Sequence, residues 1–85
     1  MPEISRFLGI VIAMLHREHG PAHFHARYGD QEITVEIESG IVTGRMSKRA
    51  LRLVLEWYEL HRGELMENWS RACRKEPLLS IPPLE

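Results

Sequence analysis

Two histidines separated by one residue are the feature of this sequence best suited to chemistry. His23 and His25 lie in the segment His-Phe-His-Ala-Arg-Tyr, in which polar and apolar residues alternate. Such alternation is typical of a β-strand with one buried face, and side chains two residues apart on a strand point to the same side. The pattern therefore predicts two neighbouring imidazoles, which could bind one metal ion or transfer protons.

Further histidines and carboxylates nearby could complete a metal site around this pair. The candidate ligands are His16, His19, His23, His25, Glu36 and Glu38. Mixed histidine and carboxylate ligands suit a divalent transition metal such as zinc, manganese or iron. A metal with open coordination positions can activate water, so one hypothesis is a metal-dependent hydrolase or ribonuclease.

Two other interpretations of the same residues stay open at this stage. The histidines and glutamates can form ordinary cross-strand pairs on a solvated sheet face, each contributing roughly 0.2–1 kcal/mol. They can also act without a metal, with His25 as a general base oriented by Glu36. The sequence contains no glycine-rich phosphate loop, nucleophile elbow or paired-cysteine motif, so it assigns no catalytic residue.

A cluster of cations surrounds the expected start of a helix and consists of Arg45, Lys48, Arg49 and Arg52. Cations at a helix N-terminus oppose its partial positive charge, at a cost of about 0.3 kcal/mol or more each. Binding of an anion would explain them, because helix amides and guanidinium groups both suit phosphate. The anion could belong to a nucleic-acid backbone or to an acidic protein. Alternatively, Glu56, Glu59 or the acidic segment 32–38 neutralises the cluster.

The residues around these candidate groups predict β-strands in the first half of the chain. Apolar residues fill segment 8–15, as in a strand covered on both faces. Strict alternation makes 32–38 the strongest strand signal, and 41–46 predicts a short edge strand. Together with 23–28, these segments predict a three- to four-stranded antiparallel meander within residues 1–46.

A hairpin between 23–28 and 32–38 would place the histidines and glutamates on one face. With Asp30 and Gln31 at its tip, apolar residues pair with apolar ones and polar residues with polar ones. The expected polar pairs are Arg27 with Thr34, His25 with Glu36, and His23 with Glu38, with Thr43 beside Glu36. We expect the helical half to cover the other face, which carries Phe24, Val35 and Ile37.

The second half of the chain, 47–76, predicts helix. Ser47 is a suitable N-cap. Apolar residues then recur at helical spacing, at Leu51, Leu55, Tyr58, Leu65 and Trp69. Gly63 either divides the segment into two helices or bends a single one, because glycine costs only about 1 kcal/mol inside a helix. Pro77 should end it, leaving an extended tail, 77–85, packed on the domain or on a partner.

Length and composition limit the class of protein. Its 85 residues and 9.9 kDa predict a single domain, 1–85. The 11 Lys and Arg against 12 Asp and Glu give a net charge of -1, which excludes a globally basic nucleic-acid binder. No signal sequence or membrane-length apolar run is seen, so we expect a cytoplasmic protein. Because so short a chain buries a small core, we expect a homodimer or another partner.

A resemblance to a known family rests on four segments, 1–7, 20–29, 50–57 and 61–69. The more specific parts are Pro-Ala-His-Phe-His-Ala and the helix containing Leu-Glu-Trp. They resemble the bacterial and archaeal family called domain of unknown function number 4160, although its members usually have a second proline where this chain has Ala22. The family has no assigned reaction. Its members often accompany a protein of another uncharacterised family, numbered 2442, in two-gene cassettes in the style of toxin–antitoxin pairs.

The resemblance implies a protein partner encoded by a neighbouring gene and supplies no catalytic residues. Combined with the residue patterns, it predicts an α+β domain that acts as a non-enzymatic component of a toxin–antitoxin-like pair. Nucleic acid is a further candidate partner. The alternative function is the metal-dependent hydrolase or ribonuclease, with His23 and His25 as ligands.

Overall fold

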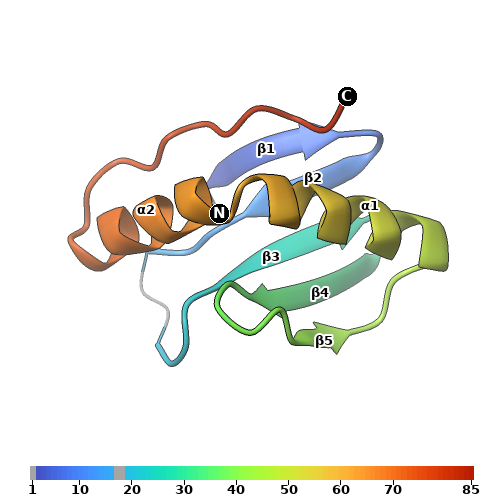
Figure 1. Cartoon of the computed structure of the whole chain (residues 1–85), viewed down its shortest axis with the longest axis horizontal. Coiled ribbons are helices and arrows are strands. Elements are labelled where there is room, and N and C mark those ends of the chain that lie inside the picture. Colours follow the sequence, from blue (N-terminus) through green and yellow to red (C-terminus); the bar gives the residue numbers. More distant parts are fainter. Residues whose placement is uncertain (1, 17–18) are drawn as a thin grey trace.

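The computed structural model describes residues 2–16 and 19–85 and shows one antiparallel sheet followed by two helices. The strands are β1 (Glu3–Phe7), β2 (Ile10–Ala13), β3 (His23–Tyr28), β4 (Gln31–Glu36) and β5 (Val42–Gly44). The helices are α1 (Lys48–Leu60) and α2 (Arg62–Cys73). Both helices lie on the same side of the sheet (Figure 1). The predicted α+β class is confirmed.

The sheet is a meander of five strands in the order β1-β2-β3-β4-β5. The predicted count of three to four is too low because residues 3–7 form a further strand, and the apolar run 8–15 is not strand throughout. Leu8 and Gly9 instead turn the chain between β1 and β2, with φ values of 51° and 83°. Positive φ at both central residues is what a two-residue type I′ hairpin requires. The added strand is therefore β1, which the sequence analysis did not predict.

The register between β3 and β4 differs from the prediction by two residues. Glu36 lies opposite His23, Thr34 opposite His25, and Glu32 opposite Arg27. The cause is the turn: it consists of Gly29 and Asp30, not Asp30 and Gln31, and Gly29 supplies the positive φ of 62° that a tight hairpin needs. The register between β4 and β5 also differs from the prediction, because Thr43 lies opposite Thr34 and not beside Glu36.

A shift by two residues leaves every side chain on its predicted face, because the side-chain period of a strand is two. Phe24 and Val35 are fully buried under the helices. The Phe24 ring contacts Trp57 and Tyr58 of α1, with ring centroids 5.7 and 6.1 Å apart. The helices thus cover the predicted face, and His23 and His25 lie on the opposite one.

Local signals explain where the helices begin and end. The Ser47 hydroxyl accepts a hydrogen bond from the Ala50 amide (3.3 Å), which confirms the predicted N-cap. The break between the helices falls at His61, whose amide donates to the Tyr58 carbonyl. The prediction of a break at Gly63 is therefore wrong by two residues; Gly63 lies inside α2.

The C-terminal tail runs alongside β1, on the same side of the sheet as the helices (Figure 1). Its anchors are polar as well as apolar. The Ile81 amide donates to the Ile4 carbonyl (2.8 Å), the Trp57 indole donates to the Pro82 carbonyl (2.9 Å), and Ile81 is buried. The tail therefore packs on the domain itself, one of the two outcomes expected from its apolar composition.

Candidate functional site

The two histidines of β3 lie side by side on the sheet face opposite Phe24, and His23, the first residue of β3, still reaches a side chain of α2. Their ring centroids are 5.3 Å apart, in an edge-to-face arrangement. Nδ1 of His25 lies 3.3 Å from a carboxylate oxygen of Glu32, and the His25 side chain is 15% exposed. Glu32 also approaches Arg27 at 3.8 Å. Among the described residues, the carboxylate beside His25 is thus Glu32, which the sequence analysis missed because it assumed the wrong register.

His23 is held by groups from other segments. Its Nδ1 donates to the Pro21 carbonyl oxygen (2.9 Å), which selects the tautomer with the proton on Nδ1. Its ring packs against Trp69 of α2, with centroids 5.2 Å apart. Glu36 is opposite it on β4, and the Glu36 carboxylate accepts a hydrogen bond from the Ser39 hydroxyl (2.8 Å). These contacts position the His23 imidazole beside His25.

The remaining predicted ligands lie elsewhere. Nε2 of His16 lies 3.1 Å from the carbonyl oxygen of Glu76, after α2, and His19 is exposed in the loop before β3. Glu38 lies in the turn after β4, and its carbonyl oxygen accepts a hydrogen bond from Arg62 (2.8 Å). Over residues 2–16 and 19–85, no three His, Cys, Asp or Glu side chains form a group able to hold a metal ion. The metal site stays a prediction from the sequence.

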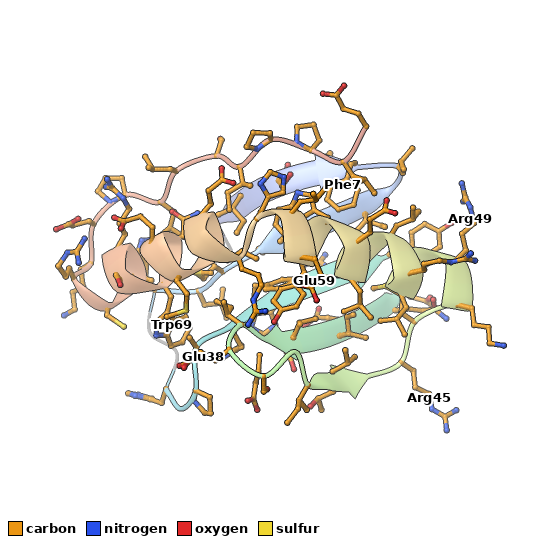
Figure 2. The ribbon with its side chains drawn as sticks, viewed as in Figure 1. Phe7, Glu38, Arg45, Arg49, Glu59 and Trp69 are labelled. Atoms are coloured by element: carbon orange, nitrogen blue, oxygen red, sulfur yellow. The ribbon has the colours of Figure 1, made fainter. Side chains whose placement is uncertain are left out.

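The basic cluster lies at the start of α1, and its four members are exposed. Arg45 and Arg49 point outward at the end of the molecule opposite α2 (Figure 2). Within the part of the chain that the structure describes, no ion pair joins Arg45, Lys48, Arg49 or Arg52 to an acidic side chain. The first turn of α1 contains no acidic residue either. The cations are therefore available to an external anionic group.

A shallow hollow of about 480 Å³ runs along the outward face of α1 and was not predicted from the sequence. We call this face the α1 outer surface; its residues are Lys48, Leu51, Arg52, Leu55, Glu56 and Glu59. The inner face of α1, which packs on the sheet, contains the four buried residues of the helix: Ala50, Val54, Trp57 and Tyr58. Leu51 and Leu55, which the sequence analysis placed on the apolar face of the helix, are half-buried at the margin of the core.

The sequence contained a pattern that could have predicted this surface. Leu51 and Leu55 have helical spacing, and charged residues flank them on both sides. Lys48 and Arg52 lie on the N-terminal half of the face, and Glu56 and Glu59 lie on the C-terminal half. Residues three or four apart on a helix share a face, so each pair forms one charged end. The periodicity alone did not show which of two overlapping apolar stripes faces the sheet.

Neither helix has the length and apolar character needed to cross a lipid bilayer, within the residues that the structure describes.

Comparison with known proteins identifies the family but not an activity. The sequence profile of the family described as "Domain of unknown function (DUF4160)" matches residues 9–70, more than half of the chain. No curated protein and no solved structure matches the chain. The matched region includes the His-Phe-His strand, α1 and most of α2, which are the elements that form the histidine pair and the α1 outer surface. The chain therefore belongs to the family of domain of unknown function DUF4160.

Proposed function

We propose that this protein is a non-enzymatic interaction component that binds a protein partner through the α1 outer surface. The observation that carries the proposal is the pair Leu51 and Leu55, which lies in a hollow whose lining, among the described residues, comes from α1 alone. As the family resemblance implies, the partner is the product of a neighbouring gene in a toxin–antitoxin-like pair. The binding function does not depend on which partner is toxic.

The physical case rests on the two faces of α1. Its inner face buries Val54 and Trp57, whereas Leu51 and Leu55 touch the core at its margin and keep part of their surface exposed. Apolar side chains that are flanked by charges suit a helix-in-groove contact, in which the apolar centre supplies affinity and the charged rim supplies orientation. Burying one leucine in full contributes about 1.5–3 kcal/mol.

The test is co-purification of the tagged full-length chain with the product of the neighbouring gene. We expect the L51E/L55E variant to lose the partner, because two carboxylates replace the apolar centre. Leu79→Glu is the matched control, since Leu79 is a half-exposed leucine of the tail that lies outside the α1 outer surface. The variant E56K/E59K changes only exposed residues and guards against a folding defect in the leucine variant.

Unchanged capture by both surface variants would overturn the proposal. Loss of capture by the leucine variant alone would be accepted only if its circular dichroism spectrum and unfolding temperature match those of the parent chain. Equal loss in Leu79→Glu would also contradict the proposal, because the effect would then not be specific to the surface.

Nucleic acid is a second candidate ligand, favoured by the four cations without acidic partners in the described residues. Phosphate contacts from arginine and lysine give binding that weakens steeply with salt. We expect an R45E/R49E variant to lose retention of DNA or RNA that the unmodified chain shows at low salt. If the unmodified chain does not bind either nucleic acid at low salt, this candidate fails.

The metal-dependent alternative has its own measurement. Elemental analysis of the gently purified chain should show stoichiometric metal if the predicted ligands act together. Loss of that metal in the H23A/H25A variant, with partner binding retained, would separate a metal site from the docking surface.

A further inference from the structure

We infer that the α1 outer surface also docks on the same surface of a second copy of this chain, with the two α1 helices antiparallel across a twofold axis. The inference rests on the proposed function, because it uses the same surface and gives it a second occupant besides the protein partner. It rests on the order of charges along α1, on the position of the leucines between them, and on the accessibility of the helix.

The charges are arranged so that the surface complements itself. Going along α1, two cations come first (Lys48 and Arg52) and two acids follow (Glu56 and Glu59). In an antiparallel pair, the cationic end of one helix faces the acidic end of the other, twice. In a parallel pair, like charges would face each other, which is unfavourable. The charge pattern therefore selects one orientation for a second copy.

The apolar residues occupy the centre of the same surface. Leu51 and Leu55 lie one helical turn apart, with charged side chains towards both ends of the face. A twofold axis near the middle of α1 would bring these two leucines against the same two residues of the copy. Interfaces of this isologous type need a surface that fits itself, with an apolar centre and a polar rim.

The helix is accessible for such a contact. α1 lies on the outside of the helical layer, and neither α2 nor the C-terminal tail passes over its outward side (Figure 1). Its 13 residues extend about 20 Å, at a rise of about 1.5 Å per residue. That length is enough for the leucines and both charged ends to meet in one flat contact between two copies.

Charge partners within the chain do not compete strongly for this surface. Among the described residues, Glu59 approaches Arg62 at 3.7 Å, and this is the ion pair that involves a residue of the surface. Both side chains of that pair are about half-exposed or more, and such pairs contribute about 0–1 kcal/mol. The charged groups can therefore turn to a partner at small cost. A contact made by one helix from each copy lies at the small end of protein interfaces, so the dimer should depend on concentration.

Sedimentation equilibrium of the full-length chain, over a range of concentrations, tests the inference. We expect the mass to rise from that of the 9.9 kDa monomer to twice that value as concentration increases. The variant K48E/R52E makes the surface entirely acidic, and E56K/E59K makes it entirely basic. Each variant alone should stay monomeric, with its dimer dissociation constant raised about tenfold or more, because like charges then face each other.

The decisive arm is the equimolar mixture of the two variants. An antiparallel pair between an acidic and a basic surface restores opposite charges at both ends, so the mixture should dimerise at a concentration where neither variant does. The control R45E/K75E reverses two exposed cations outside the surface and has the same net charge as K48E/R52E. This control should dimerise like the unmodified chain.

A mass that stays at one chain at millimolar concentration would overturn the inference, as would a mixture that fails to associate. If the chain dimerises and none of the variants changes its dimer dissociation constant, the contact lies on another surface, which would also contradict the inference. These outcomes are distinct from failure of the proposed function. Suppose that the chain stays monomeric but the L51E/L55E variant still loses its protein partner. The α1 outer surface would then remain a docking site for that partner, and the second copy would be excluded as an occupant.

Discussion

At the scale of single residues, two exposed carboxylates are held ionised by neighbouring arginines. The Arg6 guanidinium donates to both oxygens of Glu3, at 2.7 and 3.0 Å, and this hydrogen bonding lowers the pKa of Glu3. Arg74 donates to both oxygens of Glu76, at 2.9 and 3.2 Å, and likewise lowers the pKa of Glu76. One pair lies on the edge strand β1 and the other lies just after α2.

These pairs predict a specific response to acid. A carboxyl whose pKa is lower in the folded state stabilises the fold above its unfolded pKa, about 4.3 for glutamate, and this contribution is lost as the pH falls through the folded pKa. We therefore expect the variant E3Q/E76Q to lose less stability than the parent chain between about pH 6 and pH 3. The difference should be small and should shrink in high salt, because both pairs are exposed.

Urea unfolding at both pH values, in low and high salt, measures this difference. An identical loss of stability in the parent and the variant would show that these two pairs do not contribute to acid sensitivity.

The contact between His25 and a glutamate depends on the register of β3 on β4. The sequence analysis paired His25 with Glu36, whereas the structure gives Glu32 as the carboxylate beside it, at 3.3 Å. Alternation along the strand was enough to place both histidines on the uncovered face. It was not enough to choose between Glu32 and Glu36, because residues four apart on a strand lie on the same face.

At the scale of elements, β5 depends on one glycine. Gly44 has a φ of 104°, and a Cβ built there would lie 2.6 Å from the Glu32 carbonyl oxygen and 3.2 Å from the Ile33 Cα. Both atoms belong to the backbone of β4, which cannot move aside without disturbing the sheet. The close approach of β4 and β5 therefore requires glycine at this position.

We expect Gly44→Ala to destabilise the chain by about 1–3 kcal/mol, because it combines an unfavourable φ with a backbone clash. Amides in the β4–β5 ladder should also exchange faster with deuterium. Gly63→Ala is the matched control: nothing lies within 4 Å of its added Cβ, and it lies in α2. In a helix that change should stabilise by up to about 1 kcal/mol. Equal free energies of unfolding for the two variants would contradict the role given to Gly44.

At the scale of the whole molecule, the C-terminal tail joins the helical layer to the edge of the sheet. The buried side chain of Asn68 makes two hydrogen bonds to the backbone of Leu79, donating to its carbonyl oxygen (2.8 Å) and accepting from its amide (2.9 Å). Ile81 then bonds to Ile4 of β1. Because an edge strand presents unpaired backbone groups that can recruit other chains, the tail also protects β1 from strand addition.

We expect Asn68→Ala to cost about 1–3 kcal/mol, because it leaves the polar groups of Leu79 without their partner. The Leu79 and Ile81 amides should lose protection against hydrogen exchange before the amides of the central strands do. Ser80→Ala, an exposed position of the same segment, should change the free energy of unfolding by less than about 0.5 kcal/mol. Uniform loss of protection across the whole sheet would show that the tail is not a separate unit.

Much of the architecture followed from local patterns in the sequence. Alternation identified β3 and β4 and sorted their side chains between two faces, Ser47 marked the start of α1, and the apolar composition of 77–85 indicated a packed tail. These signals are local, since they depend on the pleat of a strand or on the orphaned amides of a helix turn, and such effects act within a few residues.

Contacts between distant segments determined what the local patterns left open. The register of β3 on β4 and the added strand β1 both depend on which two residues form each turn, and the pairing of the flanking strands decides that position. Which stripe of α1 faces the sheet depends on how Trp57 fits against Phe7 and Phe24, and that fit leaves Leu51 and Leu55 half-buried at the margin of the core. Periodicity specifies that a helix has an apolar side, but only close packing against the sheet selects one of two overlapping stripes.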